Sequence, residues 1–210
     1  MIITYDWEFI ERGAELPIVP ISLGMVREDG ERLYLVNGEM PLSQLARHPW
    51  LQHNVVPYLP IKMQFSATMD AANSIIEWDP EHTDYNVRVG LDEMRHRVQE
   101  FTYCESVELW GYYAAYDHVV LGQLFGTMTE WPSHLPQFTR DIMQEWERLG
   151  RPPLPRQPAS IHHALHDAQW NMEALQSLQL HELEVSNGQE GGTFPPVDDQ
   201  FPYGSERAND

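Results

Sequence analysis

The sequence predicts an α/β fold, in which a mixed β-sheet begins as an antiparallel meander, continues with parallel strands and is flanked by helices. Three apolar runs follow one another in the first 40 residues, and later apolar runs alternate with helical patterns. Hydrophobic residues make up 42% and aromatic residues 11% of the chain, which is enough to bury a core. The length of 210 residues fits one domain of ordinary size, and we expect that domain to span residues 1–185.

The three opening runs, Ile2–Ile10, Val19–Val26 and Arg32–Val36, predict strands. Asp29-Gly30 separates the second run from the third, and this dipeptide favours a tight hairpin turn. Five prolines interrupt residues 41–85, so we expect only short helices and loops in that segment.

Apolar side chains at spacings of three and four residues predict a helix over Asn86–Thr102. We expect a strand over Ser106–Trp110 and a helix over Tyr116–Phe125. Phe138–Gly150 should begin extended and then turn helical, and a long helix is expected over His162–Leu183. Four prolines make Arg151–Pro158 a loop. Residues 186–210 are rich in Gly, Pro, Asn and acids, and we expect them to form a flexible acidic tail outside the core.

The charge of the chain restricts how it can bind a polyanion. Acidic residues outnumber basic ones by 32 to 13, which gives a formal net charge of −19. This excludes a protein that holds nucleic acid through a basic patch, because such affinity comes from many lysine and arginine contacts with phosphate. Lys62 is the single lysine, so metal ions or a few placed arginines would have to help. The single cysteine, Cys104, excludes an intramolecular disulfide and argues against a cysteine-rich zinc site.

The first residues carry no basic segment and reach Asp6 early, so we expect no signal peptide. No apolar run approaches the ~18 residues that a membrane helix requires. We therefore expect a soluble cytoplasmic protein that has no membrane partner.

Two acids, Asp6 and Glu8, lie inside the most hydrophobic predicted strand. Residues two apart in a strand share a face, so both acids point one way, whereas Trp7 and Phe9 point the other way. Neighbouring carboxylates in a buried strand repel each other and lose hydration unless a cation compensates, and Mg²⁺ and Mn²⁺ prefer such oxygens. The alternative is an edge strand on which both acids are solvated.

Further polar residues stand at helix starts. Asp117 lies at the entrance to a predicted helix, where it would either cap the helix or hold a metal at the end of the sheet. His162 and Asp167 are five residues apart at the start of the long helix, so both can reach a site at its N-terminal end; a solvated first turn is the alternative. His162 and His166 would form another kind of site, a zinc-binding pair, but the glutamate usual between such histidines is missing.

Taken in order, Asp6-x-Glu8, Asp117 and His162-x4-Asp167 resemble the three motifs of the DEDDh family of 3′→5′ exonucleases. All five positions are filled, in the order and in the predicted elements of that family. The resemblance implies an RNase H-like fold for the domain.

The likeness extends beyond these motifs. Tyr5–Glu11, Trp110–Leu121 and Pro136–Arg140 are similar to segments of family members that degrade polyadenylate RNA. Trp7 departs from the small or aliphatic residue that many members carry between the first two acids. By strand alternation it points away from the site, so we expect the chemistry to be retained.

The resemblance implies a two-metal hydrolysis of single-stranded RNA from the 3′ end, giving nucleoside 5′-monophosphates. Asp6, Glu8, Asp117 and Asp167 would hold two divalent cations, Mg²⁺ or Mn²⁺. His162 would be the general base that takes a proton from the attacking water, a task that suits imidazole with its unperturbed pKa of ~6.5. Glu8 would also contact the terminal 3′-hydroxyl.

Two further residues are candidates for substrate contact. Arg140 is expected to contact phosphate, and Phe9 to stack on a base. The alternatives are a surface arginine paired with Asp141 or Glu145, and a phenylalanine of the core. The resemblance also suggests poly(A) 3′ ends as the preferred substrate and a homodimer as the assembly.

Two other functions stay open at this point. The same chemistry would serve a 3′→5′ exodeoxyribonuclease on single-stranded DNA, because no residue is identified that reads the 2′-hydroxyl. A non-catalytic nucleic-acid-binding module on the same fold is the second alternative.

Overall fold

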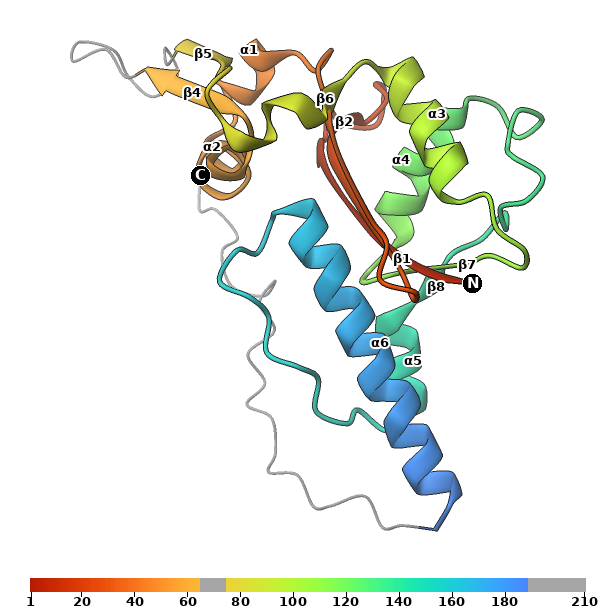
Figure 1. The fold of residues 1–210 in the computed structure, drawn as a ribbon. Coiled ribbons are helices and arrows are strands. Elements are labelled where there is room, and N and C mark those ends of the chain that lie inside the picture. Colours follow the sequence, from red (N-terminus) through yellow and green to blue (C-terminus); the bar gives the residue numbers. More distant parts are fainter. Residues whose placement is uncertain (65–74, 189–210) are drawn as a thin grey trace.

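The computed structural model describes residues 1–64 and 75–188. At its centre is a six-stranded sheet with the strand order β6-β3-β2-β1-β7-β8 (Figure 1). The strands β1 (Ile2–Ile10), β2 (Val19–Arg27) and β3 (Arg32–Asn37) form the antiparallel meander that the three apolar runs predict. Most of the expected acidic tail, from residue 189 onward, lies outside the described residues.

Three short strands complete the sheet in parallel. β6 (Arg88–Val89) pairs with β3, β7 (Glu108–Gly111) pairs with β1, and β8 (Arg140–Asp141) pairs with β7. The expected strand over Ser106–Trp110 therefore begins two residues later than its apolar pattern suggests. The predicted mixed sheet, antiparallel at first and then parallel, is confirmed.

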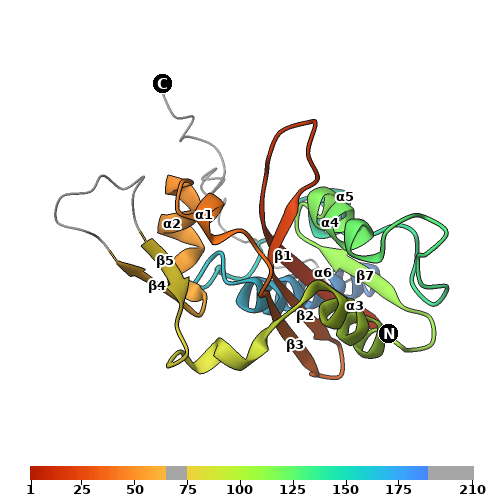
Figure 2. The ribbon, with the colours of Figure 1, turned by 90° about the horizontal axis from the view of Figure 1, so that it is seen from above.

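Helices cover both faces of this sheet (Figures 1 and 2). α3 (Leu91–Phe101) and α4 (Ala115–Phe125) pack on one face. The long helix α6 (Ala164–Ser186) runs along the other face, with α5 (Ile142–Arg148) beside it. Within the described segments, no helix is both long enough and apolar enough to cross a membrane.

Side-chain alternation along β1 separates the two layers. Ile3, Tyr5 and Trp7 are buried in the core with α3 and α4. On the opposite face, the Thr4 hydroxyl donates a hydrogen bond to the Ala168 carbonyl oxygen of α6 at 2.7 Å. The expectation that Trp7 points away from the acids is confirmed, because its side chain is only 3% exposed and belongs to this core.

Two helices begin later than the sequence patterns predict. The helix expected over Asn86–Thr102 begins at Leu91, because Thr83–Val87 form a 3-10 helix and the strand β6 follows it. The long helix begins at Ala164, so His162 lies in the turn that precedes it, where its φ of +75° is incompatible with a right-handed helix.

A smaller unit packs at one end of the sheet (Figure 2). It contains α1 (Leu42–Leu45), α2 (Pro49–Asn54) and a two-stranded antiparallel sheet of β4 (Ile61–Gln64) and β5 (Ile75–Trp78). The short helices expected over residues 41–85 are present as α1 and α2, whereas this pair of strands was not predicted. Strands of four residues beside prolines are too short to show a clear alternation of apolar and polar side chains.

Candidate active site

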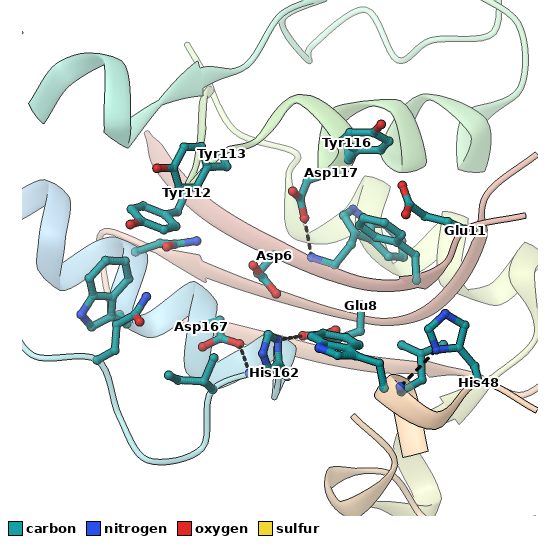
Figure 3. Close-up of a pocket in the computed structure, with 18 residues that line it drawn as sticks. Asp6, Glu8, Glu11, His48, Tyr112, Tyr113, Tyr116, Asp117, His162 and Asp167 are labelled. Carbon is teal, nitrogen blue, oxygen red and sulfur yellow. Dashed lines mark hydrogen bonds and ion pairs between the residues drawn. The ribbon is translucent and has the colours of Figure 1, made fainter. Parts of the chain in front are cut away.

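The predicted acids and the predicted histidine line one pocket of about 640 Å³ (Figure 3). Asp6 and Glu8 come from β1, and Asp117 comes from the first turn of α4. Asp167 belongs to the first turn of α6, and His162 reaches in from the turn before that helix. The structure therefore brings together all five residues that the motifs singled out.

A glycine on β2 lets α6 approach the strand closely. Gly24 lies directly opposite Asp6 in the strand register. A Cβ at Gly24 would overlap the carbonyl group of Ala164 and the Cα of Leu165. The first turn of α6 can thus pack directly on β2, which places Asp167 beside the acids of β1.

Asp117 does not cap its helix. The N-cap position of α4 is Ala114, one turn earlier, and the buried Asp117 carboxylate accepts a hydrogen bond from the Trp7 backbone N–H at 2.7 Å. The Ala114 N–H in turn donates to the Asp141 carboxylate at 2.9 Å, which fixes the start of the helix. The capping interpretation is wrong, because Asp117 lies one turn beyond the N-cap and its carboxylate binds the backbone of β1.

His162 is held by two carboxylates. Its backbone N–H donates a hydrogen bond to Asp167 Oδ2 at 2.6 Å, and its Nδ1 lies 3.6 Å from Glu8 Oε1. The side chains of His162 and Glu8 are 17% and 9% exposed. The left-handed φ of His162 is rare for a residue with a side chain, and such strain concentrates at functional sites.

The carboxylates oppose one another's ionisation. Burial raises the pKa of Asp6 well above its usual range, and Asp117, Asp167 and Glu8 raise it further through repulsion. Burial also raises the pKa of Asp117 to about 7 and that of Asp167 to about 7. The pKa of Glu8 is raised by burial, while its hydrogen bond with His162 acts in the opposite direction. Positive charge bound in the pocket would therefore favour full ionisation of the cluster.

The donor set fits a hard divalent cation. Glu8, His162 and Asp167 offer ligand atoms that all lie within 4.8 Å of one another. The remaining acids of the cluster, Asp6 and Asp117, line the same pocket. Carboxylate oxygens are the ligands that Mg²⁺ and Mn²⁺ prefer, and a cation would relieve the repulsion that raises these pKa values.

Aromatic side chains form most of the rest of the wall. No lysine or arginine is among the residues that line the pocket in the described part of the chain. Sequence patterns did not identify six ring-bearing residues of this wall: His48, Trp50, Tyr112, Tyr113, Tyr116 and Trp170. Tyr112 and Tyr113 could have been identified by their position, because they directly follow the strand β7 and loops that follow strands often hold functional residues.

The two predicted substrate contacts have different surroundings. Phe9 lines the pocket, and its ring stacks on Tyr116 with centroids 6.1 Å apart. Arg140 is outside the pocket lining: its Nε lies 3.1 Å from Glu108 Oε2, and its guanidinium covers the Trp110 ring. The alternative of a surface arginine in an ion pair is the arrangement observed, with Glu108 as the partner in place of Asp141 or Glu145.

The zinc pair suggested by His162 and His166 is not formed. His162 faces the pocket of the acids, whereas His166 lines a separate cavity. There the imidazole of His166 stacks on His163 with centroids 3.9 Å apart, and its Nδ1 lies 2.7 Å from Ser160 Oγ. The helical spacing suggested a pair, but His162 precedes the helix.

Comparisons with known sequences point to a nuclease family. The sequence model of the "3′-5′ exoribonuclease Rv2179c-like domain" matches residues 1–179. The 3′-5′ exoribonuclease Rv2179c of Mycobacterium tuberculosis H37Rv is 37% identical over 164 residues, which cover 78% of this chain and 84% of the relative. The 3′-5′ exoribonuclease MT2234.1 of strain CDC 1551 matches with the same identity and coverage.

Solved structures of exonuclease I share the fold. One, described as suggesting how processivity is achieved, superposes with a TM-score of 0.51 and 12% identity over 89% of this chain and 43% of exonuclease I. The zinc-bound complex of Escherichia coli exonuclease I with single-stranded DNA gives a TM-score of 0.52 and 12% identity, over 88% of this chain and 42% of the other. This chain thus spans less than half of exonuclease I, and the likeness shows the expected RNase H-like fold.

Proposed function

The chain belongs to the Rv2179c-like family of 3′-5′ exoribonuclease domains, and we propose that it is itself a metal-dependent 3′→5′ exoribonuclease. The substrate is single-stranded RNA, hydrolysed from its 3′ end to nucleoside 5′-monophosphates. The match over residues 1–179 and the end of α6 at Ser186 support a catalytic domain of residues 1–185.

One observation carries this proposal: four carboxylates from three separate elements converge with an imidazole in one pocket. Clustered acids whose pKa values are raised by burial and mutual repulsion are costly for folding alone. Such perturbed groups concentrate at functional sites. A structural role would not require the four acids to face a common cavity.

The acids Asp6, Glu8, Asp117 and Asp167 would hold two divalent cations, Mg²⁺ or Mn²⁺. When bound, these ions would polarise the scissile phosphate and stabilise the charge that develops on the leaving 3′ oxygen. His162 takes the proton from the attacking water, for which its position beside Glu8 at the pocket wall is suited. Glu8 also accepts a hydrogen bond from the terminal 3′-hydroxyl, so hydrolysis begins at a chain end.

The wall of the pocket suits single-stranded substrate. Unstacked bases bind to exposed aromatic rings, and each such contact is worth about 1–3 kcal/mol. Phe9 and Tyr116, already stacked on each other at the pocket wall, offer such a surface. With no lysine or arginine in the described lining, the phosphates would be held mainly by the metal ions.

Polyadenylate 3′ ends are the preferred substrate in this proposal, and a homodimer is the proposed assembly. Both rest on the resemblance of Tyr5–Glu11, Trp110–Leu121 and Pro136–Arg140 to enzymes that degrade poly(A). Size-exclusion chromatography with light scattering tests the dimer: a mass of one chain, 24.4 kDa, would refute it.

The substrate is tested with matched oligonucleotides. 5′-labelled single-stranded RNA and DNA of one sequence are incubated with the protein and Mg²⁺, and the RNA is then varied to end in A, C, G or U. We expect a ladder that shortens from the 3′ end of the RNA, fastest on the adenylate end. Shortening of the DNA alone would favour the exodeoxyribonuclease, and binding of both without cleavage would favour a non-catalytic module.

A further inference from the structure

An indole from the small unit touches the histidine of the pocket. Trp50 belongs to α2, and its ring lies edge-on to the His162 imidazole with centroids 4.7 Å apart. The contact joins two segments more than 100 residues apart in the sequence. The same indole remains 43% exposed and helps to line the pocket.

The helix that carries Trp50 is well anchored. The next residue, Leu51, is only 3% exposed and lies in the apolar core of the small unit, together with the fully buried Val55. The Leu51 backbone N–H donates a hydrogen bond to His48 Nδ1 at 3.3 Å, which fixes the start of the helix. The indole is therefore presented to His162 from a packed support.

The support matters because the other contacts of His162 described above are made with prospective metal ligands. Its backbone N–H binds Asp167, and its ring faces Glu8. Both carboxylates would be shared with cations in the working enzyme, so their hold on the imidazole would be divided. An indole offers no ligand atom to a hard cation, so its contact with the imidazole does not compete with metal binding.

We propose that Trp50 is a positioning residue, which holds the His162 imidazole in the orientation needed for proton transfer. This inference rests on the proposed function, because the proton transfer belongs to that reaction. Aromatic edge-to-face pairs favour a defined mutual geometry, and small misplacements of a catalytic group lower rates strongly. The backbone strain at His162 is consistent with a side chain that must be held in place by its surroundings.

Two substitutions of Trp50 distinguish the effect of its aromatic ring on His162 from the effect of its apolar volume. Trp50→Leu keeps an apolar side chain but removes the ring, whereas Trp50→Phe keeps a ring that can meet the imidazole. Trp78→Leu is the matched control, since Trp78 packs against the same small core and does not line the pocket. Thermal unfolding of each variant shows whether the domain remains folded.

The first readout is steady-state kinetics on single-stranded RNA with saturating Mg²⁺. We expect Trp50→Leu to lower kcat by about 10- to 100-fold with less than about a threefold change in KM. Trp50→Phe should recover most of the loss, and Trp78→Leu should leave both constants unchanged. A rise in KM at unchanged kcat would overturn the proposal, because it would make Trp50 a substrate-binding residue.

The second readout does not depend on activity. In ¹³C–¹H spectra of the imidazole groups, the His162 signal is identified by its loss in His162→Ala. The ring current of Trp50 shifts this signal, so Trp50→Leu should move it both with and without Mg²⁺, while Trp78→Leu should not. An unmoved His162 signal in Trp50→Leu would refute the contact. An inactive wild-type protein would instead refute the proposed function, and the spectra would still decide whether Trp50 orients His162.

Discussion

The backbone N–H of Trp7 donates a hydrogen bond to the Asp117 carboxylate at 2.7 Å. Trp7 stands between Asp6 and Glu8 on β1, so this bond attaches the third acid to the strand that carries the first two. The bond fixes the position of the carboxylate and favours its ionised form, although burial still raises the pKa of Asp117 to about 7. A single main-chain donor thus determines how α4 contributes to the site.

Substitutions of Asp117 separate its charge from its hydrogen bond. In Asp117→Asn the side-chain oxygen can still accept from the Trp7 N–H, whereas Asp117→Ala leaves this buried donor without a partner, at a cost of about 1–3 kcal/mol. We expect both variants to lose more than about 100-fold in activity, because a metal-binding charge is missing. Urea unfolding should show a clear loss of stability only for Asp117→Ala. Equal destabilisation by both substitutions would contradict the importance of the bond.

The metal-free protein should be more stable in mild acid than at neutral pH. The pKa values of Asp117 and Asp167 rise from an ordinary value of 3.8 to about 7 on folding, so the folded state binds more protons between these values. This stabilisation is fully present below about pH 4 and is lost as the pH rises through about 7. In EDTA we expect the Tm to fall by about 4 °C or more between pH 5 and pH 8, measured by scanning calorimetry.

Two substitutions and added metal test whether the carboxylate cluster causes this dependence of Tm on pH. Asp117→Asn should flatten the dependence, whereas Glu105→Gln, an equal change of charge at an exposed site, should not. Adding Mg²⁺ or Mn²⁺ at pH 8 should restore the Tm, since a ligand of the folded state stabilises it. A Tm in EDTA that rises from pH 5 to pH 8 would contradict the account of the cluster.

The close approach of α6 to the sheet should depend on Gly24. Gly24→Ala places a methyl group where the backbone of Ala164 and Leu165 now lies, so α6 must shift and carry Asp167 with it. We expect the free energy of unfolding to fall by about 1–3 kcal/mol. Activity should also fall in the protein that remains folded, because Asp167 is displaced. Gly122→Ala is the matched control in α4. Apart from its chain neighbours and the adjoining helix backbone, nothing lies within 4 Å of the added carbon, and alanine favours a helix. Unchanged activity in Gly24→Ala would show that the spacing is not required.

Binding of RNA should respond weakly to salt. Each phosphate neutralised by Lys or Arg adds about 0.7 to the logarithmic salt slope for single strands, and the described pocket lining holds neither residue. Fluorescence anisotropy with His162→Ala, read before its slowed hydrolysis shortens the RNA, should show less than about a tenfold loss of affinity between 50 and 200 mM salt. Arg140→Gln should bind equally well, because Arg140 is paired with Glu108 outside the pocket. A 1,000-fold loss of affinity would indicate a basic surface elsewhere.

Local patterns in the sequence were sufficient for the acids and for most of the sheet. Alternation along β1 placed Asp6 and Glu8 on one face and Trp7 on the other, as the structure confirms. The same reasoning could not choose between a cap and a site for Asp117, because that choice depends on the distance between α4 and β1. It also extended the long helix to His162, although the strained turn before Ala164 is what aims the imidazole.

The features that the sequence patterns missed depend on contacts between residues far apart in the chain. Trp50 lies in a proline-rich segment without clear periodicity, and only the packing of α2 brings it to His162. In the sequence, nothing distinguishes Gly24 from its neighbours in β2, and its role follows only from the packing of the start of α6 against it. Arg140, beside Phe138 and Thr139, was expected to contact phosphate, yet its partner Glu108 comes from a neighbouring strand of the sheet.

Single-turnover hydrolysis of 5′-labelled single-stranded RNA, compared between the wild type and His162→Ala, tests the central claim most directly. With Mg²⁺ the wild type should shorten the RNA stepwise from its 3′ end and release nucleoside 5′-monophosphates, and EDTA should stop the reaction. His162→Ala should be slower by about 100-fold or more, because general-base catalysis contributes about 10²–10⁴-fold, and should still gain thermal stability from Mg²⁺. Equal rates for the two proteins, or cleavage that persists in EDTA, would contradict the site described here.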